Sequence, residues 1–168
     1  MGGRPTADGA GGNGDPARDP ARELLLEHRL ESRLSALEAL AAAVSAALPE
    51  RADLAFKVNL CLEEIIANII RHGLGGAPGH EIRVRLSCTG DRLEVTVEDD
   101  APRYDPFAQA PVPDLTLDVA RRPVGGLGVH LVKTLMDRVR AEHHGAGNRI
   151  VLEKKMPPRG ANEESTEE

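Results

Sequence analysis

The stretch from Ala52 to Gly73 constrains this chain most, because its apolar residues recur at the spacing of an α-helix. At about 100° per residue, one broad face collects Val58, Cys61, Leu62, Ile65, Ile66, Ile69 and Ile70. A face this wide must be buried against other elements, so we expect this helix to lie at the centre of the fold. Gly73 is a suitable residue to end it.

Two polar residues lie at the edge of that face. Glu64 and Asn68 are one helical turn apart, and His72 follows one turn later. A carboxylate and a carboxamide in this arrangement can share one ligand, with Glu64 as a general base and Asn68 as an oxygen ligand for a hard cation. The alternative is an amphipathic helix whose polar edge happens to hold these residues.

Composition narrows the classes of function. The 168 residues suit one domain, and the net charge of −6 argues against general binding to DNA or RNA. With no Trp, one Tyr and two Phe, a base-stacking platform for nucleic acids is not expected. We find no membrane-spanning run or export signal, and Cys61 and Cys88 suit buried reduced thiols, so we expect a cytoplasmic protein.

The other segments predict an α+β fold. We expect helices at 32–48, 52–73 and 127–139, strands at 23–29, 82–88, 93–99, 139–144 and 149–155, and turns at 89–91 and 145–148. The order β-α-α-β-β-lid-α-β-β predicts a two-layer sandwich, with three helices on one face of a mixed, mainly antiparallel sheet. Leu131 and Leu135 are the expected core anchors of the last helix.

Other segments are expected outside this sandwich. Residues 1–20 hold few large apolar side chains and should form a disordered tail, and residues 157–168 should form an acidic tail. The segment at about 100–124 contains five prolines, at positions 102, 106, 111, 113 and 123. It is too long for a plain connector, so we expect a functional loop or lid.

Asp99 is a candidate ligand-binding residue at the end of a strand. By the alternation of the strand its side chain points to the core, where a carboxylate needs a hydrogen-bond donor. An adenine amino group would serve, and a nearby backbone amide would serve equally well.

A glycine-rich run opens the last helix. Gly125, Gly126 and Gly128 would let the backbone approach an anion, and free amides at a helix N-terminus bind phosphate. The run is neither a Walker loop nor a dinucleotide fingerprint, because GxxxxGK[ST] is absent and the third glycine position is Leu131. A flexible hinge is the alternative.

Taken together these patterns resemble a known family. The segment Glu64-x-x-x-Asn68-x-x-x-His72-Gly73 resembles the N box of the GHKL (Bergerat-fold) ATPases, in the version found in anti-sigma factor serine kinases. Residues 97–107 resemble the first glycine box, commonly D-x-G-x-x-F-D-P, and residues 125–137 resemble the second. The resemblance covers about residues 22–156, with the boxes in the family's order, and implies a histidine-kinase-like ATPase domain.

The resemblance implies an ATP- and Mg²⁺-dependent serine/threonine protein kinase. It would sequester a sigma factor and phosphorylate a STAS-domain anti-anti-sigma protein. Glu64 would be the base for a protein hydroxyl, Asn68 would hold Mg²⁺, and Asp99 would read the adenine amino group. The other expected nucleotide-binding residues are His72, Ala101, Tyr104, Gly125, Gly126, Leu127, Gly128 and Val129.

One departure from the family pattern leaves a second function open. Ala101 stands where the first box usually has Gly, and its methyl group can crowd the adenine side or narrow the conformations of the loop. The alternative function is a nucleotide-gated partner-switching module without kinase activity, although Glu64 favours the kinase. A structural domain without a ligand would require all three boxes to be coincidence. Because the family often dimerises, a homodimer is also an expected assembly.

Overall fold

The computed structural model describes residues 21–109 and 127–156. Both predicted tails and the predicted lid from residue 110 onward lie outside the described residues. The elements are β1 (Glu23–Glu31), the 3-10 turn η1 (Leu34–Ala36), α1 (Leu37–Ala47), α2 (Ala52–Asn68), the π-helical turn η2 (Ile69–Gly73), β2 (Glu81–Thr89), β3 (Arg92–Asp99), α3 (Pro106–Gln109), α4 (Leu127–Leu135), β4 (Arg138–His144) and β5 (Gly147–Lys155).

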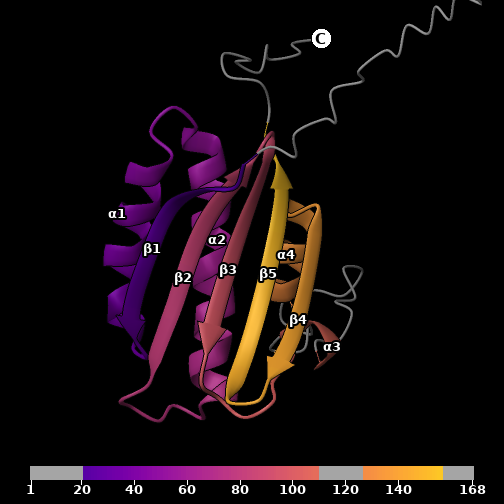
Figure 1. The fold of residues 1–168 in the computed structure, drawn as a ribbon. Helices are drawn as coiled ribbons and strands as arrows, with labels where there is room; N and C mark the ends of the chain where they lie inside the picture. The colour runs from indigo at the N-terminus through magenta and orange to yellow at the C-terminus, as the bar shows by residue number, and fades with distance from the viewer. Residues whose placement is uncertain (1–20, 110–126, 157–168) are drawn as a thin grey trace, which may run out of the picture.

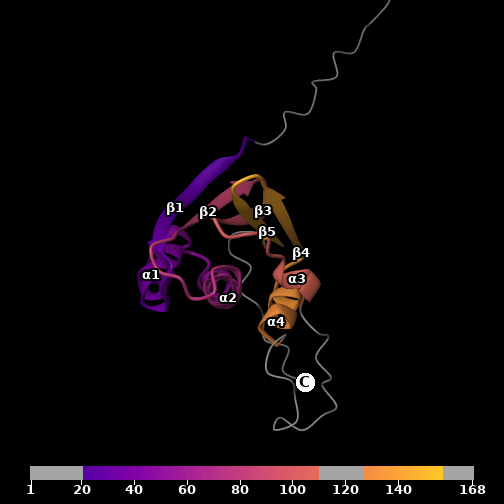
Figure 2. The same cartoon turned by 90° about the horizontal axis from the view of Figure 1, so that it is seen from below.

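The strands form one five-stranded sheet in the order β1-β2-β3-β5-β4. Figures 1 and 2 show α1, α2 and α4 packed on one face of this sheet. The predicted two-layer α+β sandwich is therefore confirmed. All pairings between the described strands are antiparallel, whereas we expected some parallel pairing. The short β2–β3 and β4–β5 connections favour this arrangement, since a tight turn can only join antiparallel strands.

The core lies between α2 and the sheet. The predicted apolar face of α2 is buried along its whole length, with Val58, Cys61, Ile65 and Ile66 fully inaccessible. Across from it lie the inward residues of the central strands, among them Val84, Leu86, Val95, Val97 and Leu152. Each large aliphatic side chain buried here contributes about 1.5–3 kcal/mol, so this layer holds α2 in place. Among the described residues, no helix is long and apolar enough to cross a lipid bilayer.

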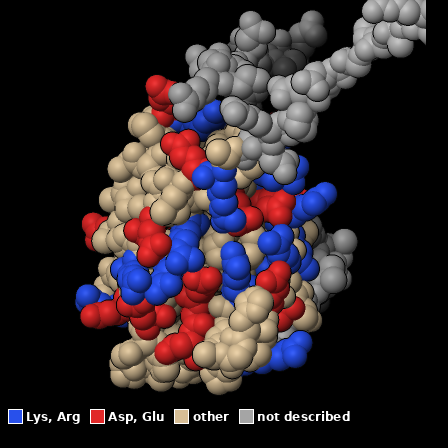
Figure 3. Space-filling view, in the orientation of Figure 1, with Lys and Arg blue, Asp and Glu red and all other residues tan. Residues whose placement is uncertain are grey.

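The other face of the sheet carries charges of both signs. Figure 3 shows acidic and basic side chains interleaved across the strands. The Nε atom of Arg85 lies 2.9 Å from the carboxylate of Glu27, and Glu153 accepts from Arg92 at 3.0 Å and from Arg140 at 2.9 Å. These pairs join neighbouring strands, and each has at least one partner that is a third or more exposed, so each contributes little to stability.

The last helix differs from the prediction in length and orientation. It ends at Leu135 instead of near Val139, and β4 begins at Arg138. Val129 and Val132 are buried, whereas the predicted anchors Leu131 and Leu135 are only half-buried. Apolar residues occur on more than one side of this helix, so spacing alone does not identify the buried face.

Three smaller predictions were also wrong. Asn148 belongs to β5 instead of the preceding turn. Ser32 precedes the first helix; its hydroxyl donates to the carbonyl of Ala77 at 3.2 Å and accepts from the amide of His80 at 3.3 Å, which fixes the loop before β2. Cys88 is half-buried, because it lies near the exposed end of β2, while Cys61 is buried as expected.

Candidate functional site

Segments that are far apart in the sequence meet at the end of the sandwich toward which β3 points in Figure 1. The chain after β3 contacts η2 and the start of β5 there, and the first turn of α4 contacts α2. Each predicted site residue that the structure describes lies on one of these segments. The fold therefore brings the N box and the first glycine box together, and it brings the first turn of α4 to the N box.

Glu64 and Asn68 occupy the edge of α2, as the helical spacing predicts. Both side chains are half-buried. Asn68 is the last residue of α2, and its side chain does not cap the π-helical turn that follows, which leaves the carboxamide available to a ligand. Single π-helical turns inside helices often occur at functional sites. His72 lies in this turn and is exposed.

Glu64 packs against the first turn of α4. A Cβ atom placed on Gly128 would overlap the carboxylate of Glu64 and would lie 3.1 Å from its Cγ atom. Glycine at position 128 therefore makes room for the candidate base. The sequence predicted that Gly128 would admit phosphate, and the described contact adds a protein side chain at the same position.

The other residues of the second glycine box divide into three cases. Gly125 and Gly126 lie outside the described residues. Leu127 is exposed, and Val129 is buried with 5% exposure. Any contact of Val129 with a nucleotide would therefore be made by its backbone.

Asp99 ends β3 with its side chain directed inward, as the strand alternation predicts, and it is 9% exposed. Its Oδ1 atom accepts from the backbone amide of Ala101 at 2.8 Å and from the side-chain amide of Asn148 at 2.9 Å. Its Oδ2 atom is buried and has no hydrogen-bond partner among the described residues. Burial raises the pKa of the Asp99 carboxyl, and the side chain of Asn148 with the backbone amides of Ala101 and Asn148 partly offsets this by favouring the ionised form.

Asn148 is the residue of this site that sequence reasoning missed. It is 3% exposed, and its Nδ2 atom donates to Asp99 and to the carbonyls of Pro102 at 3.0 Å and Ala101 at 3.3 Å. Its Oδ1 atom accepts from the backbone amide of Tyr104 at 2.9 Å. A signal exists in the sequence, because a polar residue at an inward position of a closing strand needs partners, but the glycines beside Asn148 predict a turn there.

Ala101 and Tyr104 pack against the end of the N box. A Cβ atom placed on Gly73 would lie 3.4 Å from the ring of Tyr104 and 3.5 Å from the methyl carbon of Ala101. Ala101 is 2% exposed and belongs to the hydrophobic core. No described residue other than glycine has a positive φ, so position 101 does not require glycine for its backbone conformation.

The chain after Tyr104 is fixed by a short capped helix. The carboxylate of Asp105 accepts from the amides of Phe107 at 2.8 Å and Ala108 at 3.2 Å, which is N-capping of α3, and Pro106 occupies the first helical position. The ammonium group of Lys133 in α4 donates to the carbonyl of Phe107 at 3.4 Å. Asp105 therefore caps α3, and the carbonyl of Phe107 connects this short helix to α4.

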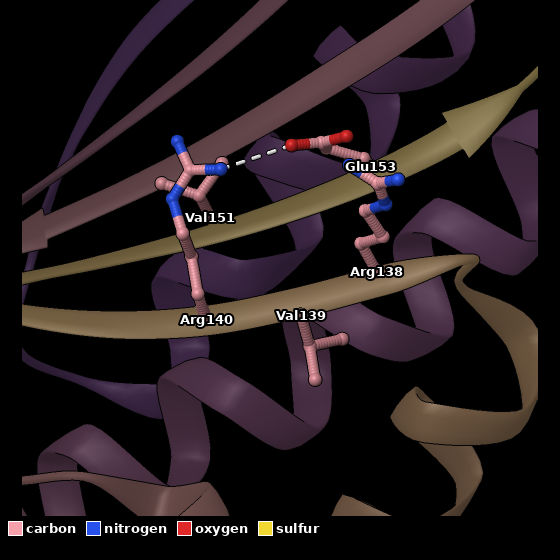
Figure 4. A pocket seen from close by; sticks show the side chains of 5 residues that line it. All are labelled: Arg138, Val139, Arg140, Val151 and Glu153. Atoms are coloured by element: carbon pink, nitrogen blue, oxygen red, sulfur yellow. Dashed lines mark hydrogen bonds and ion pairs between the residues drawn. The ribbon is translucent and has the colours of Figure 1, made fainter.

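A surface pocket elsewhere shares no residue with this site. It lies on β4 and β5 and is lined by Arg138, Val139, Arg140, Val151 and Glu153 (Figure 4). Arg140 and Glu153 point toward each other and form the ion pair drawn there, while Val139 points the opposite way. Val151 is the other valine that lines the pocket. None of its lining residues is Glu64, Asn68 or Asp99, so we assign the pocket no part in the candidate site.

Comparison with known proteins identifies the family. A family model described as the histidine kinase-like ATPase domain matches residues 26–154. The chain belongs to this family. The match spans α2, the chain after β3 and α4, so the family's histidine kinase-like domain contains every part of the site described above.

Several curated relatives are similar to this chain. Serine-protein kinase RsbW of Bacillus subtilis is 32% identical over 93 residues, covering 52% of this chain and 56% of that protein. Serine/threonine-protein kinase BtrW of Bordetella bronchiseptica is 30% identical over 109 residues, covering 64% of this chain and 75% of that protein. The chain thus spans little more than half the length of the first relative. A solved histidine kinase domain from Erythrobacter litoralis EL346 aligns at 17% identity with a TM-score of 0.47, covering 73% of this chain and 60% of that one.

Proposed function

We propose that this chain is an ATP- and Mg²⁺-dependent serine/threonine protein kinase of the anti-sigma factor type. Its family and its similarity to proteins named serine-protein kinases support this proposal. The observation that carries it is the placement of Glu64, whose carboxylate lies against the first turn of α4 and one helical turn before Asn68. A carboxylate there can accept the proton of an incoming hydroxyl group, which is the role a phosphotransferase needs beyond binding its nucleotide.

The residues at Asp99 fit the nucleotide. A buried carboxylate oxygen without a partner costs free energy unless a ligand provides a donor. The exocyclic amino group of adenine is such a donor, so we assign Oδ2 of Asp99 to it. The backbone of Ala101 and the side chain of Asn148 already satisfy the other oxygen, which leaves Oδ2 for the ligand.

Asn68 fits the metal. No cluster of three or more His, Cys, Asp or Glu side chains suited to a metal ion occurs in residues 21–109 and 127–156. A Mg²⁺ ion held by the carboxamide of Asn68 would therefore take other ligands from the phosphates and water, as is usual for this ion. When bound, Mg²⁺ neutralises negative charge on the phosphates; the protein's part is to orient Asn68 through the end of α2.

The proposed partners are a sigma factor and a STAS-domain anti-anti-sigma protein. They follow from the family version of the N box in this sequence and are supported by the similarity to RsbW proteins. The test is transfer of labelled γ-phosphate from ATP to the STAS-domain proteins of the same genome. Transfer to a serine or threonine of one of them is the expected result. Binding of ATP and of both partners without any transfer would contradict the kinase and favour a nucleotide-gated binding module.

A further inference from the structure

The side chain of Asn148 contacts the chain that follows β3 as well as its cross-strand neighbours in β3 and β4. Its side chain contacts Asp99, Ala101, Pro102 and Tyr104, which lie more than forty positions earlier in the sequence. On its other side, Oδ1 of Asn148 lies 3.0 Å from Nδ1 of His143 in β4. One buried side chain therefore ties the β4–β5 hairpin to the whole start of the first glycine box.

The orientation of the Asn148 amide is fixed by its partners. The backbone N–H of Tyr104 can only donate, so the atom it contacts must be the carbonyl oxygen Oδ1 of Asn148. The N–H group at Nδ1 of His143 donates to the same oxygen. The Nδ2 group consequently faces Asp99, and both functions of the amide are used within the protein. Asn148 itself therefore has no group left for a ligand.

This orientation determines what Asp99 can offer. The Oδ1 atom of Asp99 receives two N–H donors, whereas its buried Oδ2 atom receives none from the described residues. Because the two oxygens of a carboxylate are equivalent, whichever oxygen occupies the Oδ1 position receives both donors, and the other oxygen is left as an acceptor without a partner. Oδ2 is consequently held as a pure acceptor that can recognise an N–H donor and disfavours a carbonyl group.

We propose that Asn148 is a positioning residue that holds Oδ2 of Asp99 toward the base of the nucleotide, and thereby sets the preference for a 6-amino purine over a 6-oxo purine. This inference rests on the proposed function, because it requires the site to bind a purine nucleotide. It adds a residue from the closing hairpin to a site otherwise built from α2, the chain after β3 and α4. Asn148 acts through Asp99 and makes no contact with the base.

Replacing Asp99 by asparagine should change the preference of the site. In Asp99→Asn the oxygen stays where Ala101 and Asn148 donate to it, so the new NH₂ group takes the position of Oδ2 and becomes a donor. Titration calorimetry with ATP and with ITP, which carries a carbonyl in place of the amino group, should show the wild type preferring ATP and Asp99→Asn preferring ITP. In the double variant Asp99→Asn with Asn148→Ala, the new side-chain amide at position 99 is held by one donor only. The ratio of ITP to ATP affinity should therefore approach one.

Asn148→Ala alone should weaken ATP binding by roughly tenfold while ITP binding changes less, because one charge-assisted hydrogen bond orients the carboxylate. A parallel loss of affinity for both nucleotides would reduce Asn148 to a structural role and overturn the proposal. Asn59→Ala is the matched control. Asn59 is half-buried and donates to the carbonyl of Ala41 at 3.3 Å, so its loss should lower stability and leave the ratio of ATP to ITP affinity unchanged.

A second measurement tests the positioning without any nucleotide. The titration of the Asp99 carboxyl carbon, followed by NMR, should move to higher pH in Asn148→Ala, because the lost N–H group favours the ionised form. The titratable groups near this pair are Asp100, which raises the pKa of Asp99, His80, which is 2.8 Å from Asp100, and His143 beyond Asn148. An unchanged Asp99 titration would overturn the positioning role, whereas a wild-type protein that binds neither nucleotide would overturn the proposed function.

Discussion

The carboxylate of Glu64 fills the space beside the Cα atom of Gly128, so that glycine allows the candidate base of α2 to approach the first turn of α4. The two residues are far apart in the sequence and belong to different boxes of the family pattern. Their contact joins the helix that carries the proposed proton acceptor to the helix whose first turn is the expected phosphate site. The placement of the Glu64 carboxylate thus depends on the absence of a side chain at position 128.

Gly128→Ala should therefore displace Glu64. The added methyl group overlaps the carboxylate, which is the mobile end of a side chain and can move away without unfolding the protein. We expect phosphoryl transfer to fall by roughly tenfold to a hundredfold, the scale of a misplaced general base, with a smaller effect on thermal stability. Assays of transfer and of thermal unfolding check this. Unchanged transfer would show that Glu64 works equally well in another rotamer.

Glu64→Gln should remove the proposed proton acceptor while preserving the size and shape of the side chain. ATP affinity should change little, and phosphoryl transfer should fall by roughly a hundredfold or more. The control is Glu63→Gln, because Glu63 is exposed and points about 100° away around the helix. Transfer of labelled phosphate measures both variants. Normal transfer by Glu64→Gln would be consistent with a kinase but would show that a group other than Glu64 accepts the proton.

Gly147→Ala should destabilise the fold. A Cβ atom at position 147 would overlap the backbone carbonyl of Asp99 and lie 3.0 Å from the Cα atom of Asp100, and backbone atoms cannot move aside as a side chain can. We expect a loss of about 2 kcal/mol in the free energy of unfolding, measured in urea. Gly73→Ala is the matched control, because its nearest new contact is at 3.4 Å and its stability should change by much less.

Asp99 and Asp137 should affect stability with opposite dependence on pH. Burial raises the pKa of Asp99, so the ionised carboxylate costs stability as the pH rises through that raised value. The backbone amide of Lys155 and the ammonium of Lys154 lower the pKa of Asp137, so its contribution is present at neutral pH and lost as the pH falls through that lowered value.

The melting temperatures of Asp99→Asn and Asp137→Asn, measured relative to wild type from neutral to acidic pH, check this. The melting temperature of Asp99→Asn relative to wild type should fall toward low pH, because the wild-type carboxyl becomes neutral there and no longer costs stability. The difference for Asp137→Asn should shrink toward zero in the same direction. Differences that stay constant with pH would show that neither carboxyl titrates differently in the folded and unfolded states.

The two free thiols should react at very different rates. Burial raises the pKa of Cys61 to about 11, and the side chain is fully inaccessible, whereas Cys88 is half-buried. Since the thiolate is the reactive form, Ellman's reagent should modify Cys88 in the folded protein and Cys61 only after unfolding. The variant Cys88→Ser should therefore show almost no reaction under native conditions. A rapid reaction of that variant would indicate that α2 opens readily.

Much of the fold followed from local patterns. The wide apolar face of α2 predicted its burial, and the alternation of β3 predicted that Asp99 points inward. Both predictions succeeded because each face of a regular element is defined by residues close together in the sequence. The last helix was harder to predict, because apolar residues such as Val129, Leu131 and Leu135 occur on several of its sides. Packing against α2 and the sheet selected the valine side.

The sequence by itself determined the five strands, the three longer helices, their order and the identity of the candidate residues Glu64, Asn68 and Asp99. Only the tertiary structure determined the partners of those residues. It placed Gly128 beside Glu64 and Asn148 beside Asp99, across separations of more than forty positions. Such contacts depend on how helices and strands pack in space, and a buried polar group is satisfied by whichever donor the packing brings near it. That is why Asn148 looked like a turn residue in the sequence and connects the site to the sheet in the fold.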